Sequence, residues 1–239
     1  MKPEEHSGAA SGSQQVEAAV AELCARGEGL VTCDADGVLW RGDAGDGFLL
    51  WQIENHRLLP GAEREARRIW ETYRNGQFGE LEMAVFCASC LHGLQEEAVQ
   101  ADAREFFDRC FRTSVIPQTR SWATRLQAAG VEVWVVSGSH RWIVTAGSEA
   151  VGIRTDRMLA VAAQVRDGVI TAEVLLPVTC GLGKAEAIDR KFDRAPDLAF
   201  GNTFSDRFML DMAKVGVAVE PDEPLAALAE DCGWPILRL

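Results

Sequence analysis

The stretch from Gly29 to Trp40, G-L-V-T-C-D-A-D-G-V-L-W, constrains the fold more than any other part of the chain. Residues 30–33 are mostly apolar or β-branched, and so short a run predicts a buried strand of a parallel sheet. The strand ends on two carboxylates, Asp34 and Asp36, one residue apart. Parallel α/β proteins bind ligands beyond the carboxyl ends of their strands, and two adjacent acids repel each other unless a cation or a proton lies nearby. The stretch therefore predicts a reaction site at the end of the first strand.

The composition allows one globular α/β domain with a sizeable core. The chain has 239 residues, of which 47% are hydrophobic and 25% are charged. Its net charge of -12 argues against nucleic acid or an anionic membrane as a general partner, although local cations can still hold a phosphate in one cleft. No apolar run approaches the length of a membrane span, and the N-terminal residues M-K-P-E-E-H-S-G lack a signal peptide's apolar segment. Seven scattered cysteines are typical of free thiols in a reducing compartment, so we expect a cytoplasmic protein.

Strands and helices alternate along most of the chain, which predicts a doubly wound parallel sheet of Rossmann-like type. We expect a disordered tail over residues 1–13, an α/β core formed by 14–45 and 116–239, and a helical cap over 46–115. Three amphipathic stripes predict the cap helices, whereas the glycine-rich stretch after Gly37 is expected to be a loop or flap. Asp167-Gly168, between apolar runs at 159–165 and 169–175, predicts a β-hairpin.

Four polar segments are expected to meet at one crevice. They are Asp34–Gly37, Ser137–Ser139, Lys184 in G-L-G-K-A, and Gly201–Asp206 in G-N-T-F-S-D. Each has an ordinary structural interpretation when taken alone: a solvated turn, a helix cap, a surface lysine and another turn. The lysine segment is not a Walker-type phosphate loop, because Val178 stands where that motif needs glycine and Ala185 where it needs a hydroxyl.

In this order, and with an insertion after the first, the four segments resemble the motifs of the haloacid dehalogenase-type phosphohydrolases. The position of the insertion resembles the phosphoserine phosphatase branch, and the resemblance covers about residues 30–239. It implies a Mg²⁺-dependent phosphomonoesterase that acts on a small phosphorylated metabolite through an aspartyl-phosphate. A phosphotransferase or mutase with the same intermediate, or a non-catalytic binder of phosphorylated ligands, remains an alternative.

The resemblance also implies a role for each motif residue. Asp34 would be the nucleophile, and Asp36 the acid that protonates the leaving alcohol and then the base that activates water. Ser137 and the amides around Gly138 would hold the phosphoryl oxygens, while Lys184 would offset the negative charge of the nucleophile and phosphate.

A Mg²⁺ ion would bind Asp34, the carbonyl of Asp36 and the fourth motif. That motif departs from the family, because Asn202 replaces its first aspartate. An amide oxygen can ligate Mg²⁺ but brings no charge, so Asp206 would have to supply more of the site's negative charge, directly or through water. We expect weaker metal binding rather than loss of activity.

The cap residues bear on the substrate. In phosphoserine enzymes a cap acid binds the substrate ammonium and a cap arginine binds its carboxylate. Alignment places Asp43, with Asp46 nearby, at the acid position and Cys87 at the arginine position. The register across the cap could differ by a turn, and Arg74 or His92 is the alternative partner for the carboxylate. This pattern favours a cationic ester without a carboxylate over phosphoserine.

Tryptophans near the site elements provide a second indication of a cationic substrate. Trp40, Trp51 and Trp142 could bind a quaternary ammonium such as that of phosphocholine through cation–π contacts. The alternative is that they simply pack the core and the cap. The sequence sets neither the exact substrate nor the oligomeric state.

Overall fold

The computed structural model describes residues 12–239, and its centre is a six-stranded sheet in the order β3-β2-β1-β6-β7-β8. All neighbouring strands are parallel, which confirms the predicted doubly wound, Rossmann-like architecture. The strands are β1 (Leu30–Cys33), β2 (Glu132–His140), β3 (Met158–Val161), β6 (Leu198–Gly201), β7 (Val215–Val219) and β8 (Ile236–Leu237).

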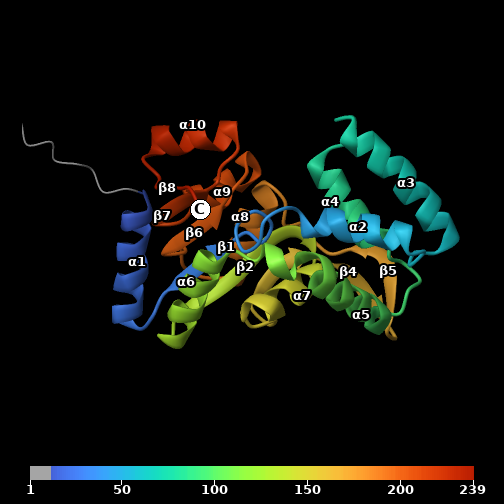
Figure 1. Cartoon of the computed structure of the whole chain (residues 1–239), viewed down its shortest axis with the longest axis horizontal. Helices are drawn as coiled ribbons and strands as arrows, with labels where there is room; N and C mark the ends of the chain where they lie inside the picture. The colour runs from blue at the N-terminus through green and yellow to red at the C-terminus, as the bar shows by residue number, and fades with distance from the viewer. Residues whose placement is uncertain (1–11) are drawn as a thin grey trace, which may run out of the picture.

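Helices cover both faces of this sheet (Figure 1). One face carries α1 (Gly12–Arg26), α6 (Pro117–Ala128) and α7 (Arg141–Val151), and the other carries α8 (Leu182–Lys191), α9 (Arg207–Asp211) and α10 (Glu223–Cys232). Successive residues of a strand point to opposite faces. Val135 of β2 therefore packs in the hydrophobic cluster under α1, α6 and α7, and Val136 packs in the separate cluster under α8, α9 and α10. Burial on both faces explains why the strands are almost continuously apolar.

The cap consists of four helices inserted between β1 and β2. They are α2 (Ala44–Glu54), α3 (Pro60–Arg74), α4 (Glu80–Ser89) and α5 (Glu96–Phe106), followed by a π-helical segment (Phe107–Phe111) and a 3-10 turn (Arg112–Ser114). The expectation of a loop through the stretch after Gly37 was wrong from residue 44 onward. There Asp43 caps α2 by accepting a hydrogen bond from the amide of Asp46 at 2.7 Å, and apolar side chains such as Phe48 and Ile53 are buried.

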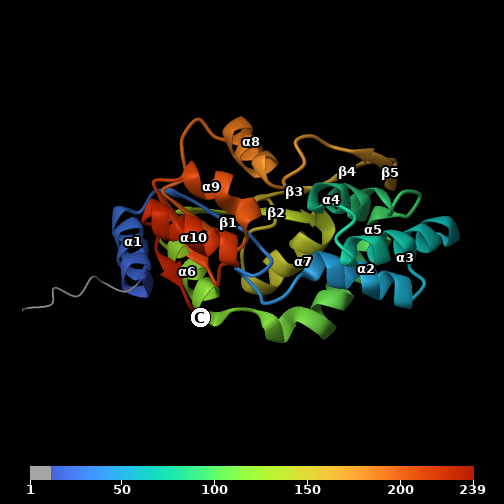
Figure 2. The same ribbon diagram turned by 90° about the horizontal axis from the view of Figure 1, so that it is seen from above.

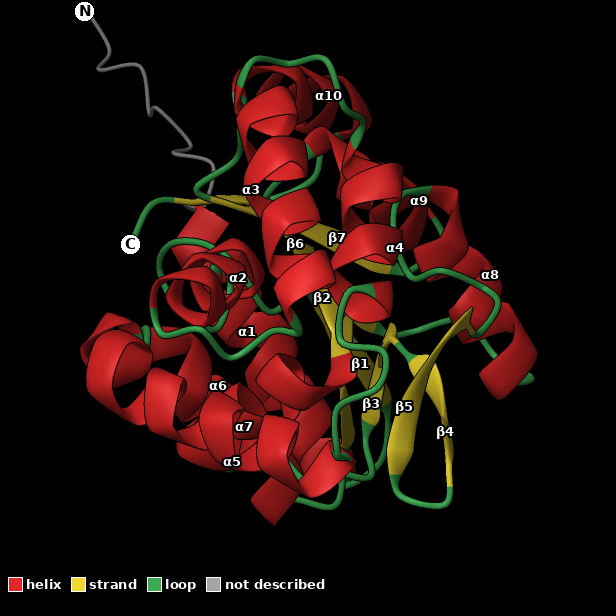
Figure 3. Ribbon diagram, turned by 90° about the vertical axis from the view of Figure 1, so that its right-hand side faces the viewer, coloured by secondary structure: helices red, strands yellow, loops and turns green. Residues whose placement is uncertain are grey.

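The predicted hairpin is present as β4 (Ala163–Arg166) and β5 (Val169–Val174), with Asp167 and Gly168 in its turn. The single strand expected over 159–165 is two strands, because the chain leaves the main sheet after β3. The hairpin extends to the cap (Figure 2, Figure 3), where the amide of Gly93 donates to the carbonyl of Ile170 at 2.8 Å and the amide of Ile170 donates to the carbonyl of Leu94 at 2.9 Å. A part of the core chain thus supports the cap.

The expected disordered tail lies outside the described residues up to residue 11, and residues 12 and 13 begin α1. Within the described part of the chain, no helix is long and apolar enough to cross a membrane.

Candidate active site

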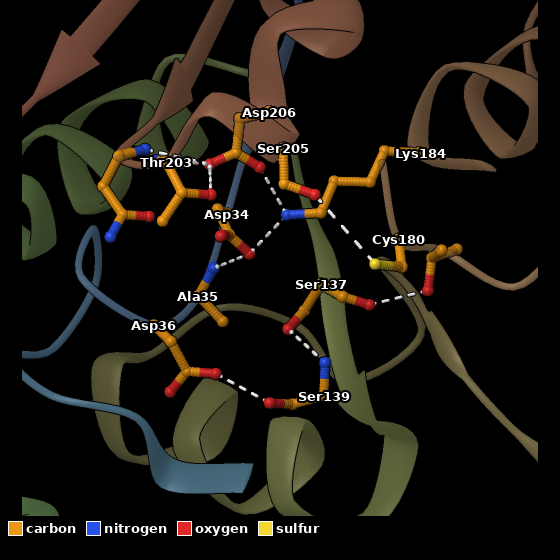
Figure 4. Close-up of polar contacts among 12 residues, drawn as sticks. Asp34, Ala35, Asp36, Ser137, Ser139, Cys180, Lys184, Thr203, Ser205 and Asp206 are labelled. Carbon is orange, nitrogen blue, oxygen red and sulfur yellow. Dashed lines mark hydrogen bonds and ion pairs between the residues drawn. The ribbon is translucent and has the colours of Figure 1, made fainter. Parts of the chain in front are cut away.

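The register of the sheet brings the polar segments to one edge. Cys33 at the end of β1 lies beside Val135 of β2 and Phe200 of β6. The residues that follow, Asp34, Ser137 and Asn202, therefore emerge together and line a cavity of about 380 Å³ between the sheet and the cap. Asp36, Gly138 and Lys184 line the same cavity. Figure 4 shows the polar contacts that Asp36 and Lys184 make there.

A buried lysine joins the first and fourth segments. The ammonium of Lys184, in the first turn of α8, lies 2.9 Å from Asp34 Oδ1 and 2.5 Å from Asp206 Oδ1. Burial lowers the pKa of Lys184, but the charges of Asp206 and Asp34 outweigh this effect and raise it, so the side chain is a permanent cation. Burial raises the pKa of Asp34 to about 7 against the opposing charge of Lys184. The amide of Ala35 also donates to Asp34 Oδ1, at 2.8 Å.

Asp206 is completely buried, and both of its carboxylate oxygens bind other groups of the protein. Its Oδ2 accepts hydrogen bonds from the amides of Asn202 and Thr203, at 2.9 and 3.1 Å, while its Oδ1 holds Lys184. The carboxylate therefore fixes the lysine and the start of the 202–206 segment, and does not line the cavity in the structure as it stands.

Asp36 is held at both of its carboxylate oxygens. Oδ1 accepts from the indole Nε1 of Trp40 at 2.7 Å and from the amide of Ala44 at 2.6 Å, and Oδ2 accepts from Ser139 Oγ at 2.7 Å. Burial, followed by the charge of Asp43, raises the pKa of Asp36 to about 7 despite these donors. A carboxyl group with such a pKa can exist in either protonation state near neutral pH.

Ser137 and Gly138 lie in the last, extended part of β2. Ser137 Oγ accepts a hydrogen bond from the amide of Ser139 at 3.1 Å, and its carbonyl accepts one from Thr179 Oγ1 at 2.6 Å. These bonds fix the backbone on both sides of Gly138, whose side of the strand faces the cavity.

Asn202 has an oxygen atom with no partner in the described structure. Its Oδ1 is buried and has no hydrogen-bond partner in the described structure. Gly37 lies directly against this side chain: its φ is +74°, and a Cβ there would lie 2.0 Å from Asn202 Nδ2, so glycine is needed. No three His, Cys, Asp or Glu side chains within residues 12–239 converge as a metal cluster. The oxygens of Asp34 and Asn202 nevertheless fit a hard cation such as Mg²⁺, which retains several waters when it binds few protein ligands.

The cap side of the cavity is acidic. Asp43, Asp46 and Glu80 line the cavity from this side. Lys184, which comes from the core, is the one lysine or arginine among residues 12–239 that lines this cavity. Burial and the charge of Asp46 raise the pKa of Asp43 to about 7, and burial and the charge of Asp36 raise the pKa of Asp46 to about 6. An added positive charge stabilises the ionised form of carboxyl groups whose pKa is raised in this way.

Cys87 lines the cavity at the position aligned with an arginine, and Cys180 faces it from the core. Burial raises the pKa of Cys87 well above its usual value and that of Cys180 to about 11. Both are therefore protonated thiols near neutral pH, unsuited to act as nucleophiles.

The three tryptophans do not line the cavity within the described structure. Trp40 is completely buried beside Phe107 and donates to Asp36, while Trp51 stacks on Phe48 in α2. Trp142 donates its Nε1 to Glu96 at 3.0 Å. These positions agree with the alternative that the tryptophans pack the core and the cap. Trp40 reaches the cavity only through its hydrogen bond to Asp36.

Ser139, Tyr73 and Glu80 line the cavity but were not predicted as site residues. Ser139 belongs to a segment expected at the crevice, but the resemblance implies a role only for Ser137 and the amides around Gly138. Tyr73 and Glu80 belong to α3 and α4, and nothing in a helical pattern shows which turn faces another helix's cavity.

A family model for haloacid dehalogenase-like hydrolases matches residues 31–211. The chain belongs to the haloacid dehalogenase-like hydrolase family. The matched region contains all four polar segments and the cap, so the geometry described above is that of a member of this family.

Relatives within the family include proteins with phosphatase names. A phosphoserine phosphatase of Idiomarina loihiensis is 28% identical over 68% of this chain and 72% of that protein. A histidinol-phosphatase of Neisseria meningitidis is 25% identical over 87% of this chain and 98% of that protein. Phosphoserine phosphatase SerB1 of Mycobacterium tuberculosis is 25% identical over 61% of this chain, and the match spans 48% of that longer protein. The chain thus spans about half the length of the mycobacterial relatives that it matches.

Solved structures show the same fold. A Bordetella pertussis protein of unknown function has a TM-score of 0.75 at 20% identity, over 87% of this chain and 97% of that one. A substrate-bound phosphoserine phosphatase has a TM-score of 0.57 at 20% identity, over 84% and 90% of the two chains. The haloacid dehalogenase-like fold, with its helical insertion after β1, is therefore shared with the phosphoserine phosphatase branch.

Proposed function

We propose that this protein hydrolyses a small phosphate monoester through an aspartyl-phosphate on Asp34. The observation that carries the proposal is the buried contact between the Lys184 ammonium and Asp34 Oδ1 at the carboxyl end of β1. Among residues 12–239 no hydrogen bond is made to Oδ2, so this oxygen is available to attack phosphorus. Lys184 offsets the charge of the two anions as they approach.

Asp36 serves both half-reactions in this proposal. It donates its proton to the leaving alcohol, and then takes a proton from the water that releases phosphate from Asp34. Its pKa of about 7 suits a group that must act in both states. Ser137 and the backbone around Gly138 hold the phosphoryl oxygens.

Asp34, the carbonyl of Asp36 and Asn202 would hold a Mg²⁺ ion, and the unpartnered Oδ1 of Asn202 supports this assignment. When bound, the ion would neutralise part of the phosphate charge. Asp206, which is occupied by Lys184 and two backbone amides, would affect the ion only through the 202–203 backbone or a bridging water.

A cationic leaving group without a carboxylate suits the cavity best. The cap supplies Asp43, Asp46 and Glu80 and no arginine to the described lining, so an ammonium group is attracted and a carboxylate is repelled. Phosphocholine, phosphoethanolamine and histidinol phosphate share this chemistry. The relative named histidinol-phosphatase, aligned over nearly its whole length, supports the same class of ester.

Loss of the nucleophile tests the covalent mechanism. Asp34→Asn should abolish phosphate release from p-nitrophenyl phosphate at saturating Mg²⁺, because an amide cannot form the aspartyl-phosphate. Circular dichroism should show an intact fold, since Asp34 lies at the edge of a cavity. Near-normal turnover by this variant would rule out Asp34 as the nucleophile.

Kinetics with matched esters test the substrate class. We expect kcat/KM for phosphocholine, phosphoethanolamine or histidinol phosphate to exceed that for phosphoserine by about tenfold or more, equivalent to about 1.4 kcal/mol. Asp43→Asn, which removes a charge and keeps a good helix cap, should reduce this preference. Equal or faster turnover of phosphoserine, or an unchanged preference in Asp43→Asn, would contradict the assignment.

A phosphotransferase or mutase would use the same residues. The two activities differ in the group that accepts the phosphoryl from Asp34, so added alcohols should divert it if the protein is a transferase. Phosphate release that stays equal to substrate consumption as alcohol is added identifies a hydrolase.

A further inference from the structure

A second cavity, of about 940 Å³, lies beside the catalytic cavity, and we call it the outer groove. It runs between cap helices α3 and α4 on one side and the core segments 176–190 and 203–208 on the other. The proposed catalytic residues Asp34, Asp36 and Lys184 line the catalytic cavity but not the outer groove. The two spaces adjoin at the residues that line both of them, which are Asp43, Tyr73, Glu80, Cys180 and Thr203.

Exposed apolar side chains gather in the outer groove. Six large apolar side chains are exposed among residues 12–239, and four of them line the groove: Leu81, Leu176, Leu182 and Phe204. Leu81 belongs to the cap and the other three to the core, so the groove has apolar walls on both sides. Exposed apolar side chains that are scattered singly need no explanation, whereas a patch of them marks a surface that binds a ligand or a partner.

Phe204 is held in place although 39% of it is exposed. The guanidinium carbon of Arg207 lies 4.2 Å from the centre of the Phe204 ring and 4.1 Å from the centre of the Phe208 ring. Arg207 also donates to the carbonyl of Phe204 at 2.7 Å, and the amide of Phe204 donates to Asp222 Oδ2 at 3.0 Å. A ligand that packs on this ring therefore loses little affinity to ordering it.

The place where the two cavities adjoin points to the alcohol part of the substrate as the occupant. In-line displacement puts the leaving oxygen opposite Asp34, on the cap side of phosphorus. Tyr73 and Glu80 of the cap line both cavities, so an alcohol too long for the catalytic cavity continues past them into the outer groove. A partner protein would also cover the apolar walls, but it gives no reason for their connection to the catalytic cavity.

We propose that the outer groove binds the distal part of the substrate's alcohol, and that this part is an apolar alkyl or aryl group. Leu81 and Leu182 determine this specificity, one from each side of the groove. The inference rests on the proposed phosphatase function and adds to it the length and the apolar character of the alcohol. An ammonium group beside Asp43 and Glu80 would lie between the phosphoryl group and the apolar part.

Primary alkyl phosphates test the groove, because their alcohols differ in length but hardly in acidity. A difference in kcat/KM between n-propyl and n-hexyl phosphate therefore reports how the three additional methylenes bind. Complete burial of one methylene gives about fourfold in affinity, and a groove buries only part of a chain. We expect kcat/KM for n-hexyl phosphate to be about tenfold higher than for n-propyl phosphate. As competitors of p-nitrophenyl phosphate the two esters should differ in the same direction, which covers slow turnover of either ester.

Leu81→Ser and Leu182→Ser should each lower kcat/KM for n-hexyl phosphate about threefold more than for n-propyl phosphate, because each removes part of an apolar wall. The two leucines are 48% and 54% exposed, so both variants should fold. Leu59→Ser in the cap and Leu175→Ser in the core are the matched controls. These leucines are 41% and 44% exposed and line neither cavity, so both controls should keep the wild-type ratio.

Several results would overturn the inference. One is no preference of the wild type for n-hexyl phosphate, and another is an unchanged preference in Leu81→Ser and Leu182→Ser. Equal losses on both esters would show that the leucines join cap to core instead of binding the alcohol. An altered oligomeric mass of these variants in size-exclusion chromatography, with the wild-type preference kept, would assign the apolar walls to a second copy of the chain. All these results leave the phosphatase assignment intact, whereas full activity of Asp34→Asn would overturn the proposed function itself.

Discussion

Asn202 stands where the resemblance to the family implies an aspartate. Among residues 12–239 its Oδ1 is buried without a hydrogen-bond partner beside the cavity, and the amide brings no charge to a site that contains Asp34 and Lys184. We expect Asn202→Asp to lower the Mg²⁺ concentration needed for half-maximal activity, because a carboxylate binds a hard cation more strongly than an amide does. Titration of activity with Mg²⁺ measures this directly. An unchanged or higher requirement would mean that the side chain at position 202 does not face the ion.

The site residues that came from strand ends were easier to predict than those that depend on side-chain direction. Asp34, Ser137 and Asn202 each follow an apolar run, so sheet register alone brings them together. Asp206 was expected to serve the metal site directly or through water; its orientation is set by Lys184 and two backbone amides that no spacing rule reveals. Trp40 was expected to contact substrate, and its burial depends on how the distant π-helical segment packs against it.

At the scale of elements, α2 shows what local sequence rules omit. G-D-A-G-D-G contains three glycines and two acids, which favour a loop. The helix forms because Asp43 caps it and because Phe48, Leu49 and Ile53 gain burial between the sheet and the rest of the cap. Tertiary burial outweighs weak helix propensity, as it does in most protein helices.

Asp43, the N-cap residue of α2, also makes the stability of the folded protein depend on pH. The pKa of Asp43 is raised from its ordinary value to about 7, first by burial and then by Asp46. The folded state therefore binds this proton more tightly than the unfolded state, and the associated stability is present below about pH 4 and lost as the pH rises through 7. In Asp43→Asn the asparagine still caps α2 but carries no charge that burial can penalise. The free energy of unfolding at pH 8 should therefore rise by about 1.4 kcal/mol or more, the equivalent of one pKa unit.

Urea denaturation of the metal-free protein at pH 4, 6 and 8 measures this effect. The wild type and Asp43→Asn should have similar stability at pH 4 and diverge at higher pH. A variant that is equally or less stable than the wild type at pH 8 would show that the Asp43 carboxyl is not penalised in the folded protein.

At the scale of the whole molecule, cap and core share one hydrophobic cluster. Phe48, Ile69 and Phe106 of the cap belong to the same cluster as Val31 and Val135 of the sheet. The α/β class and the helical insertion could be predicted because they follow from the order of apolar runs. The attachment of the cap through the β4–β5 hairpin could not, since it pairs backbone of residues 93–96 with residues more than 70 positions away.

This attachment predicts that cap and core unfold as one unit. Ile170 of β5 is 1% exposed, packs in the shared cluster, and makes two backbone hydrogen bonds to the cap segment 93–94. Ile170→Ala should cost about 2–5 kcal/mol by opening a cavity. Because the cluster is continuous, hydrogen exchange should show the same loss of protection for the slowest amides of α4 and α5 as for those of β1 and β2.

Leu225→Ala provides the matched comparison, since Leu225 is completely buried in the separate cluster on the other face of the sheet. If unfolding is cooperative, this distant cavity should lower protection in the cap as well as in the sheet. Loss of protection confined to the cap in Ile170→Ala, with sheet amides unchanged, would show instead that the cap unfolds independently and that the hairpin belongs to it. The slowest amides decide between the two outcomes because they exchange only through the largest unfolding event available to each part.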